Sequence, residues 1–300
     1  MAEIVELAPA IDVLSPDQQT SPIVLASPHA GNQYPADLIA SSALSRTALR
    51  RSEDCYVDEL FSAAPDLGAP LLRALFPRAY LDLNREAYEL DQGMFRDTLP
   101  DFVNTTSPRV AAGLGTIARI VGNQKEIYAR KLDWAEAESR IDRIYKPYHE
   151  MLQRLVNGTR DKFGYCILLD CHSMPSAGLP SNKSNASAGI DIVLGDRNGL
   201  SCAGAVTEET ERIFGTLGYS VVRNNPYAGG FTTHHYGDPK NGIHALQIEL
   251  NRALYVDETS LQRRPAFSRI KEDMRTFLQG LNRFSLNARQ ELLYRRLSAE

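Results

Sequence analysis

One apolar stretch near the middle of the chain, residues 165–174, constrains the fold more than any other segment. It is rich in Ile and Leu, which predicts a strand buried on both faces. Because side chains alternate along a strand, Asp170 and His172 point to the same face near its carboxyl end. Open α/β sheets bind their ligands at that edge. The pair therefore marks a candidate site, although a core histidine satisfied by an aspartate is the alternative interpretation.

The order of predicted elements indicates an α/β fold. Strands are expected at residues 22–27, 71–76, 79–85, 190–194, 219–223 and 242–252, and helices at 36–64, 116–157, 201–217 and 258–300. This alternation favours a mixed, largely parallel central sheet flanked by helices on both faces. No linker is evident, so we expect a single domain over 1–300, with an arm or edge strand at 1–20 and a helical tail at 284–300.

Composition excludes several classes of protein. A net charge of −4 with 43% hydrophobic residues gives no basic surface for nucleic acid or for an anionic membrane. Apolar runs reach only strand length, and the chain starts without a basic segment followed by an apolar one, so we expect neither a membrane span nor a signal peptide. The four cysteines form no C-x-x-C pair. A cytoplasmic, reduced protein is therefore expected.

Two further strands also lead into chemically active side chains. The strand at 22–27 runs into a loop shaped by glycine and prolines, and this loop carries His29. The strand at 242–252 alternates cleanly, with Glu249 between the amides of Gln247 and Asn251 on one face. A loop histidine without a ligand is the simpler interpretation of His29 alone. Together these strand ends favour a shared polar cavity.

Carboxylates and an arginine complete the set of candidates. Glu53 and Asp54 lie in an acidic segment that a solvated helix face would also explain, but Asp54 is one turn before the apolar Val57 and can share its inward side. The predicted strand at 79–85 ends in Asn84 and Arg85. A guanidinium presents a planar fork that matches a carboxylate. An ordinary ion pair at a strand end is the alternative for the arginine.

These residue types fit zinc-dependent hydrolysis without demanding it. Catalytic zinc takes three nitrogen or oxygen ligands from the protein and keeps a fourth position for water or substrate. Two histidines and one carboxylate satisfy that requirement, and a further carboxylate is needed as general base and then acid.

The chain resembles the N-formylglutamate amidohydrolase family in six short motifs that keep the family's order over about residues 22–257. They are Ser27-Pro28-His29-Ala30-Gly31, Asp54-x-x-Val57-Asp58, Leu81-Asp82-Leu83-Asn84-Arg85, Asp170-Cys171-His172-Ser173-Met174, Gly229-Gly230-Phe231 followed by His235-Tyr236-Gly237, and His244-Ala245-Leu246-Gln247-Ile248-Glu249. The family is similar to the zinc carboxypeptidase and aspartoacylase class, which implies the zinc-exopeptidase or phosphorylase/hydrolase-like fold.

The resemblance also implies roles for individual residues. It makes His29 and His172 metal ligands, Glu249 the catalytic glutamate, and Asn84 with Arg85 the pair that binds a substrate carboxylate. The class takes its second ligand from His-x-x-Glu, but the corresponding position here is Asn32, a poor zinc ligand. We therefore expect Asp54, ahead of Glu53, to supply the carboxylate.

The expected reaction is hydrolysis of the amide bond of an N-formyl or other N-acyl amino acid, with Zn²⁺ as cofactor and a small molecule as partner. His235 is expected to stabilise the oxyanion, and Tyr227 and Gln247 are further candidates for substrate contact. Some family members carry basic residues where this chain has 225–228, so the acyl-amino acid here can differ from formylglutamate. The family suggests histidine degradation as the pathway, and a homo-oligomer is compatible with the sequence.

Other functions stay open. A zinc carboxypeptidase or a peptidoglycan-type amidase would need the same site with an open groove, so the length and order of the loop at 174–189 would discriminate between these enzymes. A non-catalytic binding protein on the same fold is a further alternative, which a lack of bound zinc and of chelator-sensitive hydrolysis would favour. A serine hydrolase is disfavoured because no G-x-S-x-G motif is present, and Cys171 as a nucleophile sits in the inward apolar pattern.

Overall fold

The computed structural model describes residues 9–121, 124–177, 189–288 and 293. By its internal contacts the chain separates into two compact units. Unit 1 comprises Met1–Asp12, Pro28–Glu53 and Arg73–Met151, and unit 2 comprises Val13–Ser27, Asp54–Leu72 and Leu152–Glu300. The expectation of a single domain over 1–300 stays a prediction.

A seven-stranded sheet in the order β1-β3-β2-β4-β7-β5-β6 is the main architectural element. Its strands are β1 (Ile11–Leu14), β2 (Ile23–Ser27), β3 (Leu71–Ala74), β4 (Cys166–Met174), β5 (Ile192–Gly195), β6 (Val221–Arg223) and β7 (Ile243–Asn251). Strands β2, β4 and β7 run parallel, whereas β5 runs antiparallel to β7 and parallel to β6. The prediction of a mixed, largely parallel sheet is confirmed. A small separate ribbon pairs β8 (Val256–Asp257) with β9 (Gln262–Arg263).

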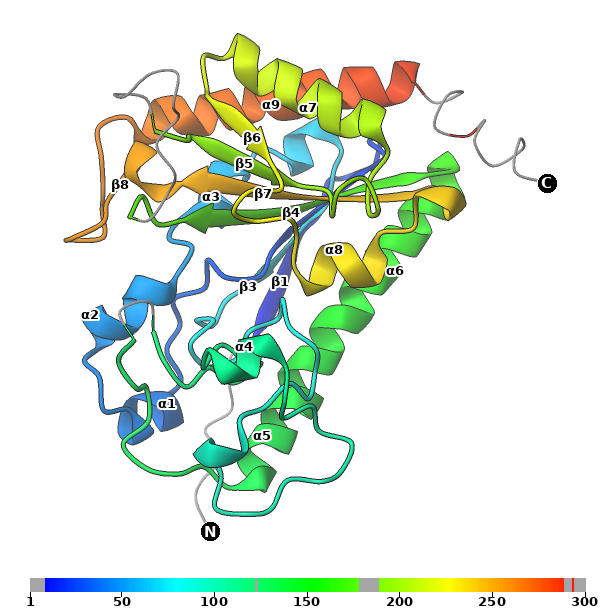
Figure 1. The fold of residues 1–300 in the computed structure, drawn as a ribbon. Coiled ribbons are helices and arrows are strands. Elements are labelled where there is room, and N and C mark those ends of the chain that lie inside the picture. The colour runs from blue at the N-terminus through cyan, green and yellow to red at the C-terminus, as the bar shows by residue number, and fades with distance from the viewer. Residues whose placement is uncertain (1–8, 122–123, 178–188, 289–292, 294–300) are drawn as a thin grey trace. The chain divides into compact units, whose positions relative to one another are not determined.

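Helices cover both faces of the sheet. The α-helices are α1 (Ala36–Ser41), α2 (Arg46–Leu49), α3 (Val57–Leu60), α4 (Pro108–Ala111), α5 (Trp134–Arg140), α6 (Lys146–Phe163), α7 (Gly204–Thr216), α8 (Phe231–Tyr236) and α9 (Phe267–Asn287). Short 3-10 turns are η1 (Arg50–Ser52), η2 (Pro65–Leu67), η3 (Gln92–Met94), η5 (Pro239–Asn241) and η6 (Arg252–Leu254), and a π-helical turn, η4 (Ile141–Tyr145), joins α5 to α6. Helices α7 and α9 lie along one face, while α8 packs on β7 from the other (Figure 1). None of the described helices is long and apolar enough to cross a membrane.

The core of unit 2 lies between the sheet and helices α7 and α9. Helix α9 buries Ile270, Met274, Phe277 and Leu281 along one side, at the spacing of an amphipathic helix. Phe277 stacks on Phe214 of α7 with ring centroids 4.3 Å apart. Within the predicted ranges 201–217 and 258–300, α7 and α9 form because each buries one apolar stripe against the sheet layer, although residues 262–263 are a strand and not helix.

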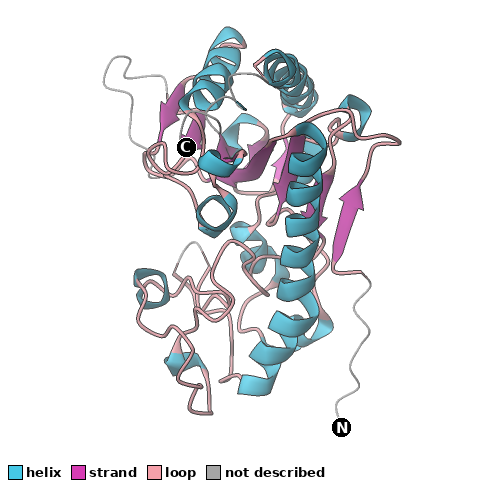
Figure 2. Ribbon diagram, turned by 90° about the vertical axis from the view of Figure 1, so that its right-hand side faces the viewer, coloured by secondary structure: helices cyan, strands magenta, loops and turns pink. Residues whose placement is uncertain are grey.

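Unit 1 contains far more loop than the sequence suggests. Most of the stretch between Arg73 and Asp133 forms turns and loops, so the expectation of a strand at 79–85 and of helix from residue 116 is wrong (Figure 2). Helix begins only at Trp134, where a capping box of Asp133 and Glu136 satisfies the first backbone N–H groups. The side chain of Asp82 accepts a hydrogen bond from the Asn84 N–H at 2.9 Å, a local turn that competes with strand pairing.

A buried cation organises the loops of unit 1. Arg140 is buried, and its guanidinium lies 3.9 Å from the ring centroid of Tyr80. Nη1 of Arg140 donates to the Tyr80 carbonyl and to the Tyr128 hydroxyl, at 3.1 and 2.7 Å. Because a buried guanidinium needs compensating contacts, the Nη1 hydrogen bonds and the ring contact of this one residue tie three segments of the unit together.

The predicted terminal and loop segments are only partly described. Within the expected arm at 1–20, residues 11–14 form the edge strand β1, and residues 1–8 lie outside the described residues. Helix α9 continues to Asn287, and most of the expected tail at 284–300 lies outside them too. So do residues 178–188 of the long loop after β4.

The loop that follows β2 is fixed by a glycine. A Cβ on Gly31 would lie 2.3 Å from the carbonyl oxygen of Phe76, and the Gln33 N–H donates to the Leu75 carbonyl at 2.9 Å. The backbone of this loop therefore packs directly against residues 75–76. This contact fixes the loop that carries His29 and needs a residue without a side chain.

Gly31→Ala should destabilise the protein by at least about 2 kcal/mol, because backbone atoms cannot move aside as a side chain can. The matched control is Gly158→Ala in α6, where a Cβ would meet nothing within 4 Å; this change should stabilise the helix by about 0.5–1 kcal/mol. Urea denaturation of both variants measures the two free energies of unfolding. Equal effects would show that the close approach at Gly31 is unimportant.

Candidate metal centre and catalytic site

The parallel pairing of β4 with β7 aligns four polar side chains in unit 2. Asp170 is the register partner of Gln247, and His172 is the register partner of Glu249. All four are buried, with Glu249 only 7% exposed. Alternation along each strand places them on one face, as the sequence predicts for Asp170 with His172 and for Gln247 with Glu249.

His172 is held between two carboxylates. Its Nε2 lies 2.9 Å from Oδ2 of Asp170, and its Nδ1 lies 3.0 Å from Oδ2 of Asp54. Burial by itself disfavours the charged imidazole, but the neighbouring carboxylates of Asp170 and Asp54 raise the pKa of His172 well above its usual range. The imidazole is therefore fixed in orientation, with its Nδ1 facing the Asp54 carboxylate.

Asp54 reaches this position because of the backbone just before α3. Tyr56 adopts a left-handed conformation with φ of 64°, and the Val57 N–H donates back to the Asp54 carbonyl at 3.2 Å. The turn directs the Asp54 side chain inward, where it is 1% exposed. Nη2 of Arg252 lies 3.5 Å from Oδ1 of Asp54, and Arg252 also donates to the Ser173 hydroxyl at 3.3 Å.

Arg252 is a residue that the sequence analysis missed. The only signal was its place immediately after the strand that carries Glu249. Its guanidinium compensates part of the negative charge that Asp54 and Asp170 bury beside His172.

In unit 1, His29 is paired with Asp82. Nε2 of His29 lies 2.7 Å from Oδ1 of Asp82, and both side chains are buried. Burial alone would raise the pKa of the Asp82 carboxyl, but the cations Arg78 and Arg85 reverse that effect. Its pKa lies well below the usual range, so the carboxylate is ionised and can accept a hydrogen bond from Nε2–H of His29.

Asp82 is thus the second functional candidate that sequence reasoning did not identify. It also holds Arg78, whose Nη2 is 2.6 Å from Oδ2, and lies 3.6 Å from Nη2 of Arg85. The sequence placed residues 79–85 on a strand, where Asp82 and Arg85 would point to opposite faces. In the turn that forms instead, both lie together.

In unit 1, Asn84 is buried and Arg85 beside it is partly buried. The guanidinium of Arg85 donates through Nε to the Leu114 carbonyl at 2.8 Å and through Nη1 to the Asn84 carbonyl at 2.7 Å. The Tyr145 hydroxyl donates to the Arg85 carbonyl at 2.7 Å. Burial lowers the pKa of Arg85 from its ordinary value, although it stays a cation. Such a fixed, desolvated guanidinium suits an incoming carboxylate.

The choice between the two acidic candidates follows from their partners. Glu53 accepts from the Tyr34 hydroxyl at 2.6 Å and forms an ion pair with Arg50 at 3.2 Å. Asp54 instead faces His172. This geometry favours Asp54 as the carboxylate ligand over Glu53.

One group of metal-ligating side chains stands out among the described residues. His29, Asp54 and His172 each offer one ligand atom, and these atoms lie within 4.8 Å of one another. The three residues, two imidazoles and one carboxylate, form a donor set that zinc takes. His29 follows β2, whose Ala26 pairs with Asp170 of β4, so the chain leaves the sheet beside the strand that carries His172.

Three further predicted residues lie in the segment that includes α8 or directly beside it. The Gly230 N–H donates to Oε1 of Gln247 at 2.7 Å, which ties the start of α8 to β7. His235 is exposed on α8, and its ring stacks on Phe231 with centroids 4.9 Å apart. Tyr227 packs against an apolar cluster that includes Met174. The substrate contact expected of Tyr227 and the oxyanion stabilisation expected of His235 stay predictions.

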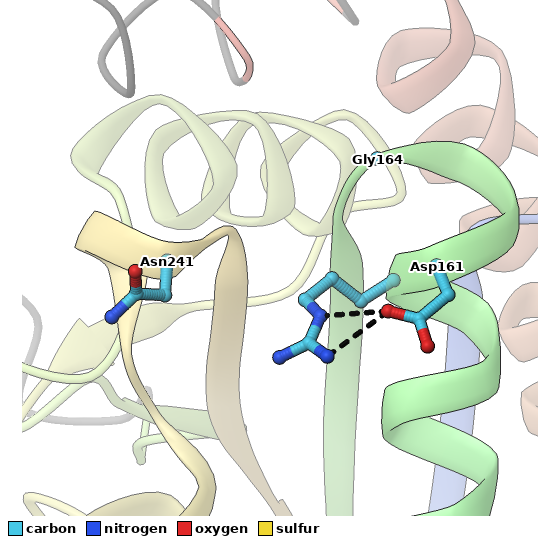
Figure 3. Close-up of a pocket in the computed structure, with 4 residues that line it drawn as sticks. Asp161, Gly164 and Asn241 are labelled. Atoms are coloured by element: carbon cyan, nitrogen blue, oxygen red, sulfur yellow. Dashed lines mark hydrogen bonds and ion pairs between the residues drawn. The ribbon is translucent and has the colours of Figure 1, made fainter.

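A surface hollow of about 430 Å³ in unit 2 is unrelated to these residues. Its lining includes Asp161, Gly164 and Asn241 (Figure 3). Gly164 and Asn241 lie just before the amino ends of β4 and β7, whereas His172 and Glu249 lie near the carboxyl ends. With about 3.3 Å per strand residue, the hollow is at the opposite edge of the sheet.

Comparison with known proteins agrees with this arrangement. A profile of the family described as N-formylglutamate amidohydrolase matches residues 21–256, which is more than half of the chain. The chain belongs to the N-formylglutamate amidohydrolase family. The prediction of an amidohydrolase is confirmed at this level.

Three individual relatives are named for N-formylglutamate. An N-formylglutamate deformylase of Pseudomonas putida is 31% identical over 250 residues, covering 82% of this chain and 86% of the relative. One of Pseudomonas aeruginosa is 28% identical with the same coverage. The crystal structure of N-formylglutamate amidohydrolase from Ralstonia eutropha JMP134 is 34% identical, with a TM-score of 0.85, covering 94% of this chain and 99% of that one. A gene product of Agrobacterium tumefaciens shares the fold at 17% identity and a TM-score of 0.62, with 92% and 94% covered.

The cysteines of this family member are all buried and form no disulfides, and none belongs to the metal-ligating group. Burial raises the pKa of the Cys171 thiol well above its ordinary value, so a thiolate nucleophile there is disfavoured. Cys171 points to the apolar face of β4, as its alternation with His172 predicts.

The native protein should therefore leave its thiols unreacted with a disulfide reagent such as DTNB, and all 4 should react after unfolding in guanidinium. Counting released thiolate at 412 nm measures both numbers. A fast-reacting thiol in the native protein that also inactivates it would bring the cysteine-nucleophile alternative back.

Proposed function

We propose that this protein is a zinc-dependent amidohydrolase that cleaves the amide bond of an N-formyl amino acid, with N-formyl-L-glutamate as the leading substrate. The observation that carries the proposal is the grouping of His29, Asp54 and His172 in a chain of this family. Glu249, the register partner of His172, supplies a further buried carboxylate beside it. The names of the relatives support the substrate.

His29, Asp54 and His172 would hold the metal. Zinc bound by two imidazoles and a carboxylate acts as a Lewis acid and makes water a stronger acid. A carboxylate engages Nε2 of each histidine, at 2.7 Å for His29 and 2.9 Å for His172, which leaves Nδ1 of each ring as the nitrogen proposed to bind the metal.

Glu249 is the proposed general base and acid. Its carboxylate takes the proton of the attacking water and then delivers it to the leaving amine nitrogen, so that formate and a free amino acid form. Its place beside the proposed ligand His172 supports this role. His235 is the proposed donor to the developing oxyanion, and Tyr227 a proposed contact with the substrate.

Arg85 and Asn84 are the proposed anchors for the substrate α-carboxylate. Among the described carboxylates, Asp82 is the nearest to Nη2 of Arg85. Its Oδ2 atom lies 3.6 Å away, which is too far for a good hydrogen bond. A carboxylate ligand would complete its hydrogen bonding. The histidine-degradation pathway and a cytoplasmic location stay predictions.

The zinc-loaded protein should release formate from N-formyl-L-glutamate, lose this activity with 1,10-phenanthroline, and regain it when zinc is restored.

Glu249→Gln should lower kcat at least about 100-fold, because the proton carrier is lost. Metal analysis should still find one zinc per chain. Parallel assays with N-acetyl and N-succinyl amino acids and a dipeptide define the acyl group. Chelator-insensitive hydrolysis, or full activity of Glu249→Gln, would contradict the proposal. Zinc binding without hydrolysis of any of these substrates would favour a binding protein.

Arg85→Ala should raise KM about 10- to 100-fold with a smaller change in kcat, since a charge-assisted contact is worth about 1.5–3 kcal/mol. Arg275→Ala is the control, because it removes a partly exposed arginine whose ion pairs are with Asp66 and Glu272. Steady-state kinetics with N-formyl-L-glutamate gives both constants. A fall in kcat alone for Arg85→Ala would assign the arginine to a different step.

A further inference from the structure

We propose that Gln247 is a positioning residue that aims the carboxylate of Glu249, and does not itself bind the substrate. This inference rests on the proposed function, since it assigns the residue that prepares the general base. It changes the role that the sequence suggested for Gln247.

The side-chain amide of Gln247 is engaged at both ends within unit 2. Its Nε2 donates to Oε1 of Glu249 at 2.8 Å, and its Oε1 accepts the Gly230 N–H at 2.7 Å. A backbone N–H can only donate, so the oxygen of the amide must face Gly230. This fixes the orientation of the amide and obliges its NH₂ group to face the Glu249 carboxylate.

The anchor at Gly230 depends on a glycine in the neighbouring strand. Gly195 of β5 is the register partner of Gln247. A Cβ on Gly195 would lie 2.7 Å from the Gly229 nitrogen and 2.8 Å from the Ala228 carbonyl carbon. The loop backbone therefore lies directly over the strand, which brings the Gly230 N–H within reach of the Gln247 oxygen.

The environment makes this hydrogen bond a strong constraint. Gln247 and Glu249 are 4% and 7% exposed, on one face of a strand whose residues are all buried. A charge-assisted hydrogen bond in such a place is stronger than one in water and restricts the carboxylate to one rotamer. Without this hydrogen bond, the Glu249 carboxylate could rotate out of the geometry needed for proton transfer. This change lowers kcat and does not affect binding of the substrate in its ground state.

Two variants of Gln247 separate its contacts. Gln247→Met keeps the approximate shape and removes both hydrogen bonds. Gln247→Glu keeps an acceptor for Gly230 but offers an acceptor where Glu249 needs a donor. Ser201→Ala is the matched control, because its buried hydroxyl donates to the Ala245 carbonyl of the same strand at 2.9 Å.

With N-formyl-L-glutamate and zinc-loaded protein, both Gln247 variants should lower kcat about tenfold or more, with KM within about twofold of the wild type. Ser201→Ala should keep both constants. In a Glu249→Gln background, Gln247→Met should cause no further loss, because the residue acts only through that carboxylate. Zinc content and circular dichroism confirm that each variant is folded and loaded.

A rise in KM with unchanged kcat would overturn the inference and return Gln247 to the substrate-binding residues. The inference would also be overturned if Gln247→Met lowered kcat in the Glu249→Gln background as much as it does in the wild type. If Gln247→Met fails to fold, the Gln247→Glu comparison still decides. Absence of hydrolysis by the wild type is a different result, since it contradicts the proposed function and not the hydrogen bonds of Gln247.

Discussion

Pairing of a buried carboxylate with the Nε2 atom of a histidine is the interaction on which the candidate site depends. Asp82 engages His29 in unit 1, and Asp170 engages His172 in unit 2. In each pair the carboxylate fixes the ring and leaves Nδ1 directed elsewhere. The same device recurs in metal sites of unrelated proteins, because the outer carboxylate also makes the imidazole a better donor.

Burying these charges has a cost in stability that function must justify. Asp54, Asp170 and Glu249 gather around one imidazole, and Arg252 is the described cation beside Asp54. Replacing such clusters by apolar side chains is often neutral or stabilising. The cluster is therefore better explained by a metal cation that it can bind than by any contribution to folding.

Sequence periodicity was sufficient to predict the strands that carry the chemistry. A continuous apolar run predicted β4, which the structure shows buried throughout, and strict alternation placed Gln247 with Glu249 on one face of β7. The role of Asp82 was not predicted, because its own side chain stabilises a turn where the apolar pattern suggested a strand. The anchoring of Gln247 was not predicted for another reason. It depends on the lack of a side chain at the glycine Gly195 and on a loop that is distant in sequence. Pattern rules describe one element at a time, whereas both of these contacts join separate elements.

Crystals of the zinc-loaded protein, measured on both sides of the zinc absorption edge, test the central claim most directly. The account predicts one anomalous peak per chain, about 2.0–2.1 Å from Nδ1 of His29 and of His172 and about 2.0–2.2 Å from a carboxylate oxygen of Asp54. Nε2 of each histidine should keep its contact with Asp82 or Asp170. A zinc ion bound through the Nε2 atoms, or one that leaves His29 or His172 uncoordinated, would contradict the account.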